Sequence, residues 1–323
     1  MTAPLINRRT ALGLIGAAAT YPTTGRAAQF EQAQGRAFAT DWQVTGPVGV
    51  GVSRLQAAFK ALFEEIDAEM SPWRSDSAIS RFNLAGTAEF AVTPEFETVT
   101  DAALHLARIS DGAFDPTVGP LVSQWGFGPI RQEWAGDWRG IQLGTGKVRK
   151  SDAALSLDPC GIAKGRALDR AGALAHDMGF EDLLLDLGGE LLALGHRASG
   201  QNWRVGIENP MTRLGPVAVL ALPEGMAAAT SGLSQNSYLF GGRFWGHIID
   251  PHRAEPVDGA LRSVTVVSTA AMHADGWATA LFAAGPGRQV ELAREHDIAA
   301  VFLFEEDGRL RQIATGGIAD MLV

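Results

Sequence analysis

The sequence is poor in cysteine and in basic residues. Cys160 is the only cysteine among 323 residues, so an intramolecular disulfide framework is excluded. Cys160 also lies far from the amino terminus, where a lipid-attachment cysteine would be expected. Lysine and arginine together number 27 against 36 acidic residues, which gives a net charge of −9. A protein with this charge balance is not expected to bind nucleic acid.

Long apolar runs are missing beyond the amino-terminal segment, so no later stretch is expected to span a membrane. Residues 1–28 hold Arg8-Arg9 before a short apolar run at 11–19, and they resemble a twin-arginine export signal. We therefore expect a signal at 1–28, one domain at 29–323, and a periplasmic protein that is peripheral to the membrane at most. The alternative is an unstructured amino-terminal arm with a chance arginine pair.

What is present is typical of a globular protein, with 46% hydrophobic and 20% charged residues. A stripe of large apolar residues predicts an amphipathic helix at 53–70. Thr93-Pro94 provides the capping hydroxyl and the first-turn proline of another helix, which ends near Ser110. Further helices are predicted after the turn at 158–169, ending near Met178, and at 271–281 and 287–296.

Strands are predicted where apolar residues alternate or form short runs. A hairpin that turns at Gly188-Gly189 is predicted at 183–194, and the other strands are at 34–50, 154–157, 203–207, 217–222, 263–268 and 298–305. The segment 70–83 is interpreted as irregular, and so is 111–121, because two acids, two glycines and two prolines in eleven residues exclude a regular element. No repeat or low-complexity linker marks a domain boundary, so we expect one α+β domain.

Asp275 and Thr279 are the first candidate ligands. They are four residues apart in a predicted helix, so they share one face. A carboxylate and a hydroxyl are hard oxygen ligands of the kind that Mg²⁺ binds when phosphate oxygens complete its coordination shell. The alternative interpretation is a capping aspartate near a helix start, with no role for Thr279.

A second candidate site is the turn at 158–169, which leads from a predicted strand into a helix. Free N–H groups at such a helix start can cradle a phosphate or a cofactor. The glycine pattern matches neither a dinucleotide fingerprint nor a Walker loop, so the spacing alone is a weak signal.

Seven stretches occur in the order found in one family, and the chain resembles the ApbE family of FAD:protein FMN transferases. The resemblance spans about residues 34–323, which is nearly the whole chain after the predicted signal. The stretches are MSPWRSDSAISRFN (70–83), DGAFDPTVGPL (111–121), LDPCGIAKGRALDRA (157–171), LLLDLGGELLALG (183–195), ATSG (229–232), HIIDP (247–251) and AMHADGWATALF (271–282).

The resemblance implies an α+β, two-lobed, T-fold-related domain with a mixed sheet packed by helices and FAD in the cleft between the lobes. It implies Mg²⁺-dependent transfer of FMN from FAD onto a Thr or Ser hydroxyl of an acceptor flavoprotein, with release of AMP. The acceptor would be the FMN-binding domain of a membrane respiratory complex. An FAD pyrophosphatase and a non-catalytic flavin-binding maturation protein remain the alternatives.

The resemblance also implies roles for individual residues. Gly161, through its carbonyl, would bind the metal together with Asp275 and Thr279, and His247 would assist the transfer. The positions that match the family's flavin and nucleotide contacts are Phe38, Trp73, Ala113, Phe114, Asp115, Asp158, Lys164 and Ile249. The plainer interpretation makes Phe38, Phe114 and Ile249 core residues, Lys164 a solvated helix residue and His247 a structural histidine.

Overall fold

The computed structural model describes residues 30–212, 214–234, 237–240 and 243–323. The predicted signal segment, 1–28, lies outside the described residues, so the signal and the domain boundary after it stay predictions.

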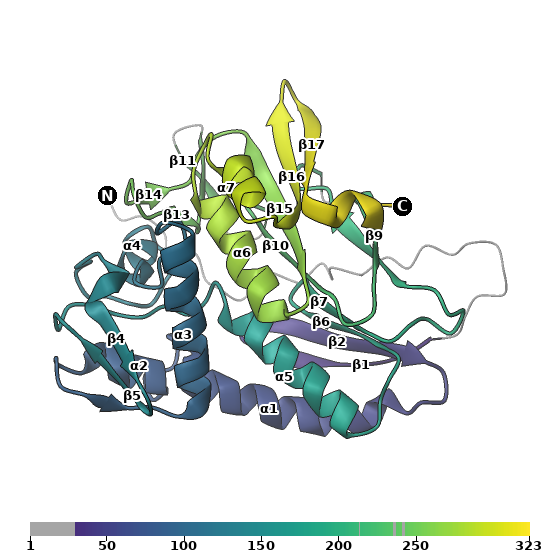
Figure 1. The fold of residues 1–323 in the computed structure, drawn as a ribbon, viewed down its shortest axis with the longest axis horizontal. Helices are drawn as coiled ribbons and strands as arrows, with labels where there is room; N and C mark the ends of the chain where they lie inside the picture. Colours follow the sequence, from purple (N-terminus) through teal and green to yellow (C-terminus); the bar gives the residue numbers. More distant parts are fainter. Residues whose placement is uncertain (1–29, 213, 235–236, 241–242) are drawn as a thin grey trace, which may run out of the picture.

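An eight-stranded sheet runs through the molecule (Figure 1), and each of its strand pairs is antiparallel. In spatial order its strands are β1 (Phe30–Ala37), β2 (Thr40–Pro47), β6 (Leu183–Leu187), β7 (Glu190–Leu194), β10 (Ala227–Gly232), β15 (Leu261–Ser268), β16 (Ala299–Glu306) and β17 (Arg309–Thr315). The combination of helices with this sheet confirms the predicted α+β class. The expected mixed sheet is antiparallel throughout its described pairings.

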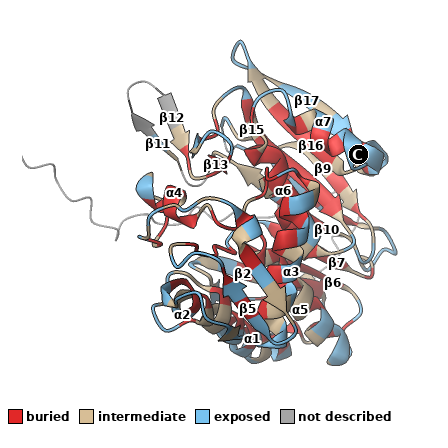
Figure 2. Cartoon of the chain, turned by 60° about the vertical axis from the view of Figure 1, so that its left-hand side comes forward, coloured by how far each residue is buried: buried red, intermediate tan, exposed pale blue. Residues whose placement is uncertain are grey.

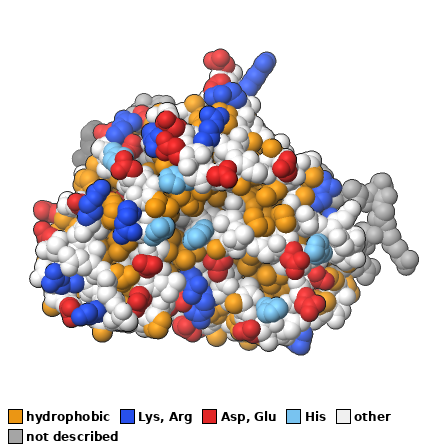
Figure 3. All heavy atoms as spheres, in the orientation of Figure 1, with side chains coloured by type: hydrophobic (Ala, Val, Ile, Leu, Met, Phe, Trp, Pro, Cys, Tyr) orange, Lys and Arg blue, Asp and Glu red, His pale blue; other side chains and the backbone are white. Residues whose placement is uncertain are grey.

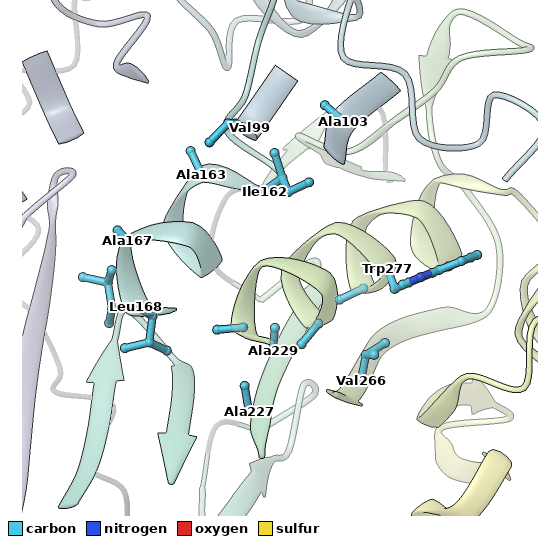
Figure 4. Packing of buried hydrophobic residues seen from close by; sticks show 14 of the residues in the cluster. Val99, Ala103, Ile162, Ala163, Ala167, Leu168, Ala227, Ala229, Val266 and Trp277 are labelled. Atoms are coloured by element: carbon cyan, nitrogen blue, oxygen red, sulfur yellow. The ribbon is translucent and has the colours of Figure 1, made fainter. Parts of the chain in front are cut away.

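Helices cover one face of the large sheet. α1 (Leu55–Met70), α5 (Ala163–Asp177) and α6 (Ala271–Ala283) pack on its strands and on one another. The main hydrophobic core lies in this layer, and Figure 2 shows the buried side of α6 against the central strands. α6 is built mostly of small residues because it approaches its neighbours closely: a Cβ at Gly276 would lie 2.7 Å from Leu106 Cδ2. Figure 4 shows Ala227, Ala229 and Val266 beneath this helix.

A second, smaller core lies on the other face of the sheet. It joins Leu184 and Val301 of the sheet to Trp203 and Leu222 of a separate hairpin, β8 (Trp203–Glu208) and β9 (Pro216–Leu222). Strands with both faces buried therefore carry apolar residues at successive positions, as at 183–187.

The remaining elements lie beside or at the edges of the sheet (Figure 1). The helices are α2 (Ala78–Leu84), α3 (Pro94–Ile109), α4 (Gly119–Gln124) and α7 (Gln289–Glu295), with short 3₁₀ turns η1 (Val52–Arg54), η2 (Trp138–Gly140) and η3 (Gly316–Met321). The small sheets comprise β3 (Phe90–Ala91), β4 (Ile141–Gly144) and β5 (Lys147–Lys150), β11 (Ser237–Phe240) with β12 (Arg243–Gly246), and β13 (Ile249–Asp250) with β14 (Glu255–Pro256).

Several predicted elements differ from the structure. The strand predicted at 34–50 is a hairpin, because Phe38 and Ala39 have positive φ angles and reverse the chain. The strand predicted at 154–157 is absent from the described structure, since the side chain of Asn83 binds both backbone groups of Leu157. The segments 70–83 and 111–121 are predicted to be irregular, but α2 begins inside the first and α4 begins inside the second.

The outer surface gives little further indication of function. Acidic and basic side chains are interspersed on the face shown in Figure 3. Among the described residues, no helix combines the length and apolar character that a membrane span requires.

Candidate active site

Helices α5 and α6 cap each other's amino-terminal turns. Asp275 Oδ2, on α6, accepts a hydrogen bond of 3.0 Å from the backbone N–H of Gly165 on α5. Asp169, on α5, accepts bonds of 2.6 and 3.0 Å from the N–H groups of Ala271 and Met272, which begin α6. These N–H groups have no partner within their own helix, so an acceptor on the neighbouring helix fixes the pair in register. Gly165 permits the close approach, because a Cβ there would overlap the carbonyl of Ala271.

This packing brings together the three oxygens of the predicted metal site. Asp275 is buried, with 4% of its surface exposed. Thr279 lies one turn further along α6, and its Oγ1 donates to the carbonyl oxygen of Gly161 over 3.3 Å. Gly161 has to lack a side chain, since a Cβ would lie 2.9 Å from Thr279 Cγ2. Ser231 Oγ, at the end of β10, is 3.4 Å from Thr279 Oγ1.

A lysine and a second carboxylate complete this group. Lys164 Nζ, in the first turn of α5, forms an ion pair with Glu190 Oε1 at the start of β7. The same ammonium lies 3.9 Å from Asp275 Oδ1. Lys164 was among the predicted site residues, but Glu190 was not. Its position directly after the turn at Gly188-Gly189 is the signal that could have identified it, because that turn belongs to one of the shared stretches.

We refer to Gly161, Lys164, Glu190, Asp275 and Thr279 as the acid–lysine cluster. Burial raises the pKa of Asp275. Burial and the charge of Asp275 also raise the pKa of Glu190, whereas the ion pair with Lys164 opposes this rise. Burial alone would lower the pKa of Lys164, but the charges of Asp275 and Glu190 hold it above its ordinary value. With all three groups ionised the cluster carries one net negative charge. A bound cation would therefore offset the cost of burying these carboxylates.

The loop at 111–121 packs against the turn that presents Gly161. Asp158 N donates to the carbonyl of Pro116 over 2.7 Å, and its carboxylate accepts from the backbone N–H of Cys160 at 3.0 Å. Phe114 is buried, and its ring lies 3.3 Å from where a Cβ of Gly161 would be. The structure thus places the predicted residues Phe114 and Asp158 beside Gly161, and Ala113 and Asp115 flank Phe114 in the same loop. Burial raises the pKa of Asp115 and Asp158 above the ordinary range.

Phe38 lies in the β1–β2 turn, at the same end of the sheet as Glu190. The backbone N–H of Gly188 in the β6–β7 turn donates to the carbonyl of Asp41 over 3.0 Å, which joins the two turns. The Phe38 ring contacts Phe63 edge-on, with ring centroids 5.8 Å apart. Trp73 lies between α1 and α2, and it is 55% exposed. Its predicted flavin contact stays a prediction.

His247 lies among aromatic rings. We call Trp125, Phe127, Tyr238, Trp245 and His247 the aromatic group. Ring centroids are 4.9 Å apart in the stacked pair Trp125–Trp245 and 5.3 Å apart in the stacked pair Phe127–Tyr238. His247 meets Phe127 edge-on, with the ring centroids at 6.2 Å.

The aromatic group adjoins the acid–lysine cluster through the chain that follows β10. Ser231 contacts Thr279, and two residues later Leu233 packs so closely on Gly246 that a side chain at Gly246 would overlap it. Gly246 directly precedes His247. Ile249, also a predicted contact, is 3% exposed in β13, as a core residue would be.

Metal binding by side chains alone is not indicated. Within the described ranges, no three His, Cys, Asp or Glu side chains are grouped as a metal ion would require. The predicted set instead joins one carboxylate to a hydroxyl and a backbone carbonyl, which leaves further positions for phosphate or water oxygens. Two surface cavities, of about 410 and 600 Å³, are lined by residues 135–155 and by residues of β1, β2 and α1. Neither is lined by the predicted site residues, so the FAD cleft stays a prediction.

Known proteins are similar in sequence to most of this chain. The model of the ApbE family matches residues 38–302. The chain belongs to the ApbE family. A protein named FAD:protein FMN transferase from Klebsiella pneumoniae is 31% identical over 293 residues, covering 84% of this chain and 83% of that protein. One of the same name from Vibrio cholerae is 33% identical over 282 residues, covering 83% and 84%.

Solved structures give the same result. The flavin transferase ApbE from Vibrio cholerae superposes with a TM-score of 0.80 at 29% identity, over 91% of this chain and 99% of that chain. The apo flavinyl transferase ApbE from Pseudomonas stutzeri has a TM-score of 0.80 at 29% identity, over 91% and 96%. The predicted family and fold class are confirmed, and the chain is placed in a family of transferases.

Proposed function

We propose that this protein transfers FMN from FAD onto a Thr or Ser hydroxyl of an acceptor flavoprotein and releases AMP. The names of its relatives support the reaction. The observation that carries the proposal is the convergence of Asp275, Thr279, Gly161 and Lys164 at the point where α5 and α6 cap each other. One buried carboxylate, two neutral oxygens and an ammonium are suited to a metal-bound pyrophosphate.

Mg²⁺ fits this set. Asp275 Oδ1, Thr279 Oγ1 and the carbonyl oxygen of Gly161 would hold it, and all three are hard oxygen ligands. When bound, the ion would neutralise charge on the pyrophosphate as AMP leaves. Lys164 would bind a phosphate oxygen nearby, because its side chain is 33% exposed while that of Glu190, its partner, is only 6% exposed.

His247 would serve as the general base. The transfer forms a bond between the acceptor oxygen and the phosphorus of FMN, and it breaks the bond from that phosphorus to the oxygen of AMP. A Thr hydroxyl is a poor nucleophile unless its proton is removed, and a histidine that titrates near neutral pH can accept it. The proton would pass to an imidazole nitrogen of His247, which adjoins the acid–lysine cluster through Leu233 and Gly246.

We further propose export to the periplasm and an acceptor that is the FMN-binding domain of a membrane respiratory complex. The support for export is Arg8-Arg9 before a short apolar run. Replacing both arginines with lysine should leave the precursor in the cytoplasm, as fractionation and immunoblotting would show. Unchanged periplasmic accumulation of that variant would remove the twin-arginine route.

The reaction is tested by incubating the protein with FAD, Mg²⁺ and a candidate FMN-domain acceptor. Intact mass should show one FMN added to the acceptor, AMP should appear in equal amount, and EDTA should prevent both. Free FMN and AMP with an unmodified acceptor would indicate a pyrophosphatase instead. Bound FAD without any AMP would indicate a non-catalytic flavin-binding protein.

A further inference from the structure

The two oxygens of Asp275 have different surroundings. Oδ2 accepts the backbone N–H of Gly165 at 3.0 Å. Oδ1 lies 3.9 Å from Lys164 Nζ, which is beyond hydrogen-bond distance. Oδ1 is thus the oxygen that a metal ion would use. The ammonium of Lys164 lies near this oxygen without forming a hydrogen bond to it.

The backbone of Glu190 is fixed at the point where its side chain meets Lys164. It begins β7, where its backbone pairs with Leu187 of β6. Gly188 and Gly189 have positive φ angles and form the turn before it, and Asp186 accepts the N–H of Gly189 at 2.9 Å. The Glu190 side chain is 6% exposed. A buried carboxylate on a fixed backbone determines the position of the flexible lysine that binds it, because the lysine side chain is a long and flexible stem.

From this arrangement we propose that Glu190 is a positioning residue, which keeps the ammonium of Lys164 off Asp275 Oδ1 and so leaves that oxygen free for Mg²⁺. The proposal rests on the proposed function. Without the negative charge of Glu190, the nearest carboxylate to Lys164 is Asp275. The ammonium then moves onto Oδ1 and competes with the metal ion for the same atom.

The test is a double-mutant cycle with Glu190→Gln and Lys164→Met. Mg²⁺ is titrated calorimetrically into each FAD-loaded variant without acceptor, and the dissociation constant is the readout. Glu190→Gln should weaken Mg²⁺ binding about tenfold, a size typical of coupling between neighbouring sites. In the Lys164→Met background the same change should have little effect, because the competing ammonium is gone.

An equal loss in both backgrounds would show that Glu190 acts through its charge alone and would overturn the proposal. A Glu190→Gln variant that binds Mg²⁺ like the wild type would overturn it as well. Wild-type protein that binds no Mg²⁺ at all would contradict the proposed function itself.

Two further variants serve as controls, one for the loss of any carboxylate and one for a change of side chain at Glu190 that retains the charge. Glu89→Gln removes an exposed carboxylate that pairs with Lys147 at 2.7 Å, and it should leave Mg²⁺ binding unchanged. Glu190→Asp retains the charge and should keep most of the Mg²⁺ affinity. If Glu190→Gln fails to fold, as its melting curve would show, Glu190→Asp and the Glu190→Gln/Lys164→Met double variant carry the test. A strong loss of Mg²⁺ affinity in Glu190→Asp that also occurs in Glu190→Asp/Lys164→Met, relative to Lys164→Met alone, would then overturn the proposal.

Discussion

The acid–lysine cluster and the aromatic group adjoin each other but are built differently. In the cluster, backbone groups fix the side chains: Gly165 binds Asp275, and the carbonyl of Gly161 accepts from Thr279. In the aromatic group, the contacts are between ring faces and edges, as in the pair Trp125–Trp245. Directional hydrogen bonds in a buried place hold atoms in one geometry, whereas ring contacts tolerate small shifts.

The difference suggests that the two regions have different roles in the reaction. A pyrophosphate and its cation need fixed oxygen positions, because charge has to be neutralised at one place. An incoming acceptor protein has to be admitted and released, which a surface of partly exposed rings can permit. On this account, substitutions in the cluster should affect FAD and metal, whereas substitutions in the aromatic group should affect the step that involves the acceptor.

In the aromatic group, the largest effect is expected at His247. His247→Asn should slow FMN transfer at pH 7 about a hundredfold, because general-base catalysis is worth at least that much. FAD affinity, measured by fluorescence quenching, should stay close to that of the wild type. His252→Asn, at an exposed position five residues further along, is the matched control. A similar loss of FAD affinity in His247→Asn would place this residue in the binding region instead.

A smaller effect is expected on binding at the cluster side. Lys164→Ala and Asp158→Ala should each weaken FAD binding about tenfold, since a charged or hydrogen-bonding group near the phosphates is worth roughly 1.5 kcal/mol or more. Each substitution should cost more free energy in FAD binding than in stability of the fold, so the melting temperature should change little. Lys147→Ala, in an exposed pair, should leave FAD binding unchanged. Titrations with unchanged affinity for both site variants would remove the turn at 158–169 from the FAD site.

The smallest effect concerns the stability of the hairpin that carries Glu190. Burial raises the pKa of Asp186 to about 6, although the N–H of Gly189 partly opposes this. A carboxyl whose pKa is raised in the folded protein stabilises it below the unfolded pKa, and this contribution is lost as the pH rises through about 6. Asp186→Asn should therefore raise the free energy of unfolding at pH 7 by about 1–2 kcal/mol.

Urea unfolding at several pH values would measure this effect. As the pH rises from about 4 to about 6, the wild type should lose stability relative to Asp186→Asn. The change begins near pH 4 because the unfolded carboxyl titrates there. Parallel pH profiles for the two proteins would show that folding does not raise the pKa of Asp186.

Elements with local signals could be predicted from the sequence. Thr93 Oγ1 accepts the N–H of Phe96 at 3.1 Å, so the predicted hydroxyl cap of α3 is present. The apolar stripe of α1 is buried, as its spacing required. Both signals lie within a few residues of the element that they define, and for this reason no knowledge of the fold was needed.

Features that depend on distant residues could not be predicted. Leu157 lies in a strand-like run, but Asn83, 74 residues away, satisfies its backbone groups. Phe38 and Ala39 turn the chain without glycine or asparagine, so no turn signal was visible. The same holds in the site, where Glu190 meets Lys164 only because β7 and α5 pack together.

The motif order provided the site residues that spacing could not. Gly161 and Lys164 are predicted through the family resemblance, whereas helical spacing already pairs Asp275 with Thr279, and the structure brings the four together. Their arrangement also accounts for a residue that had no predicted role: Asp169 caps α6 from α5. The metal and FAD roles of these residues stay predictions.

The central claim is that Asp275 holds a metal ion against the FAD pyrophosphate. Asp275→Asn retains an oxygen that can accept from Gly165 N but removes the charge. A capping role would survive this change with a loss of about 1 kcal/mol or less. A metal role would not survive it, and one lost electrostatic stabiliser is worth roughly 3 kcal/mol, or more than a hundredfold in rate.

The decisive measurement is Mg²⁺-dependent release of AMP by Asp275→Asn and wild type at one Mg²⁺ concentration. Melting temperature is recorded alongside, and Asp177→Asn, at an exposed position near the end of α5, serves as the control. The account predicts that AMP release falls more than a hundredfold in Asp275→Asn, with a nearly unchanged melting temperature and a fully active control. Release of AMP by Asp275→Asn at close to the wild-type rate would contradict the metal site and the mechanism that depends on it.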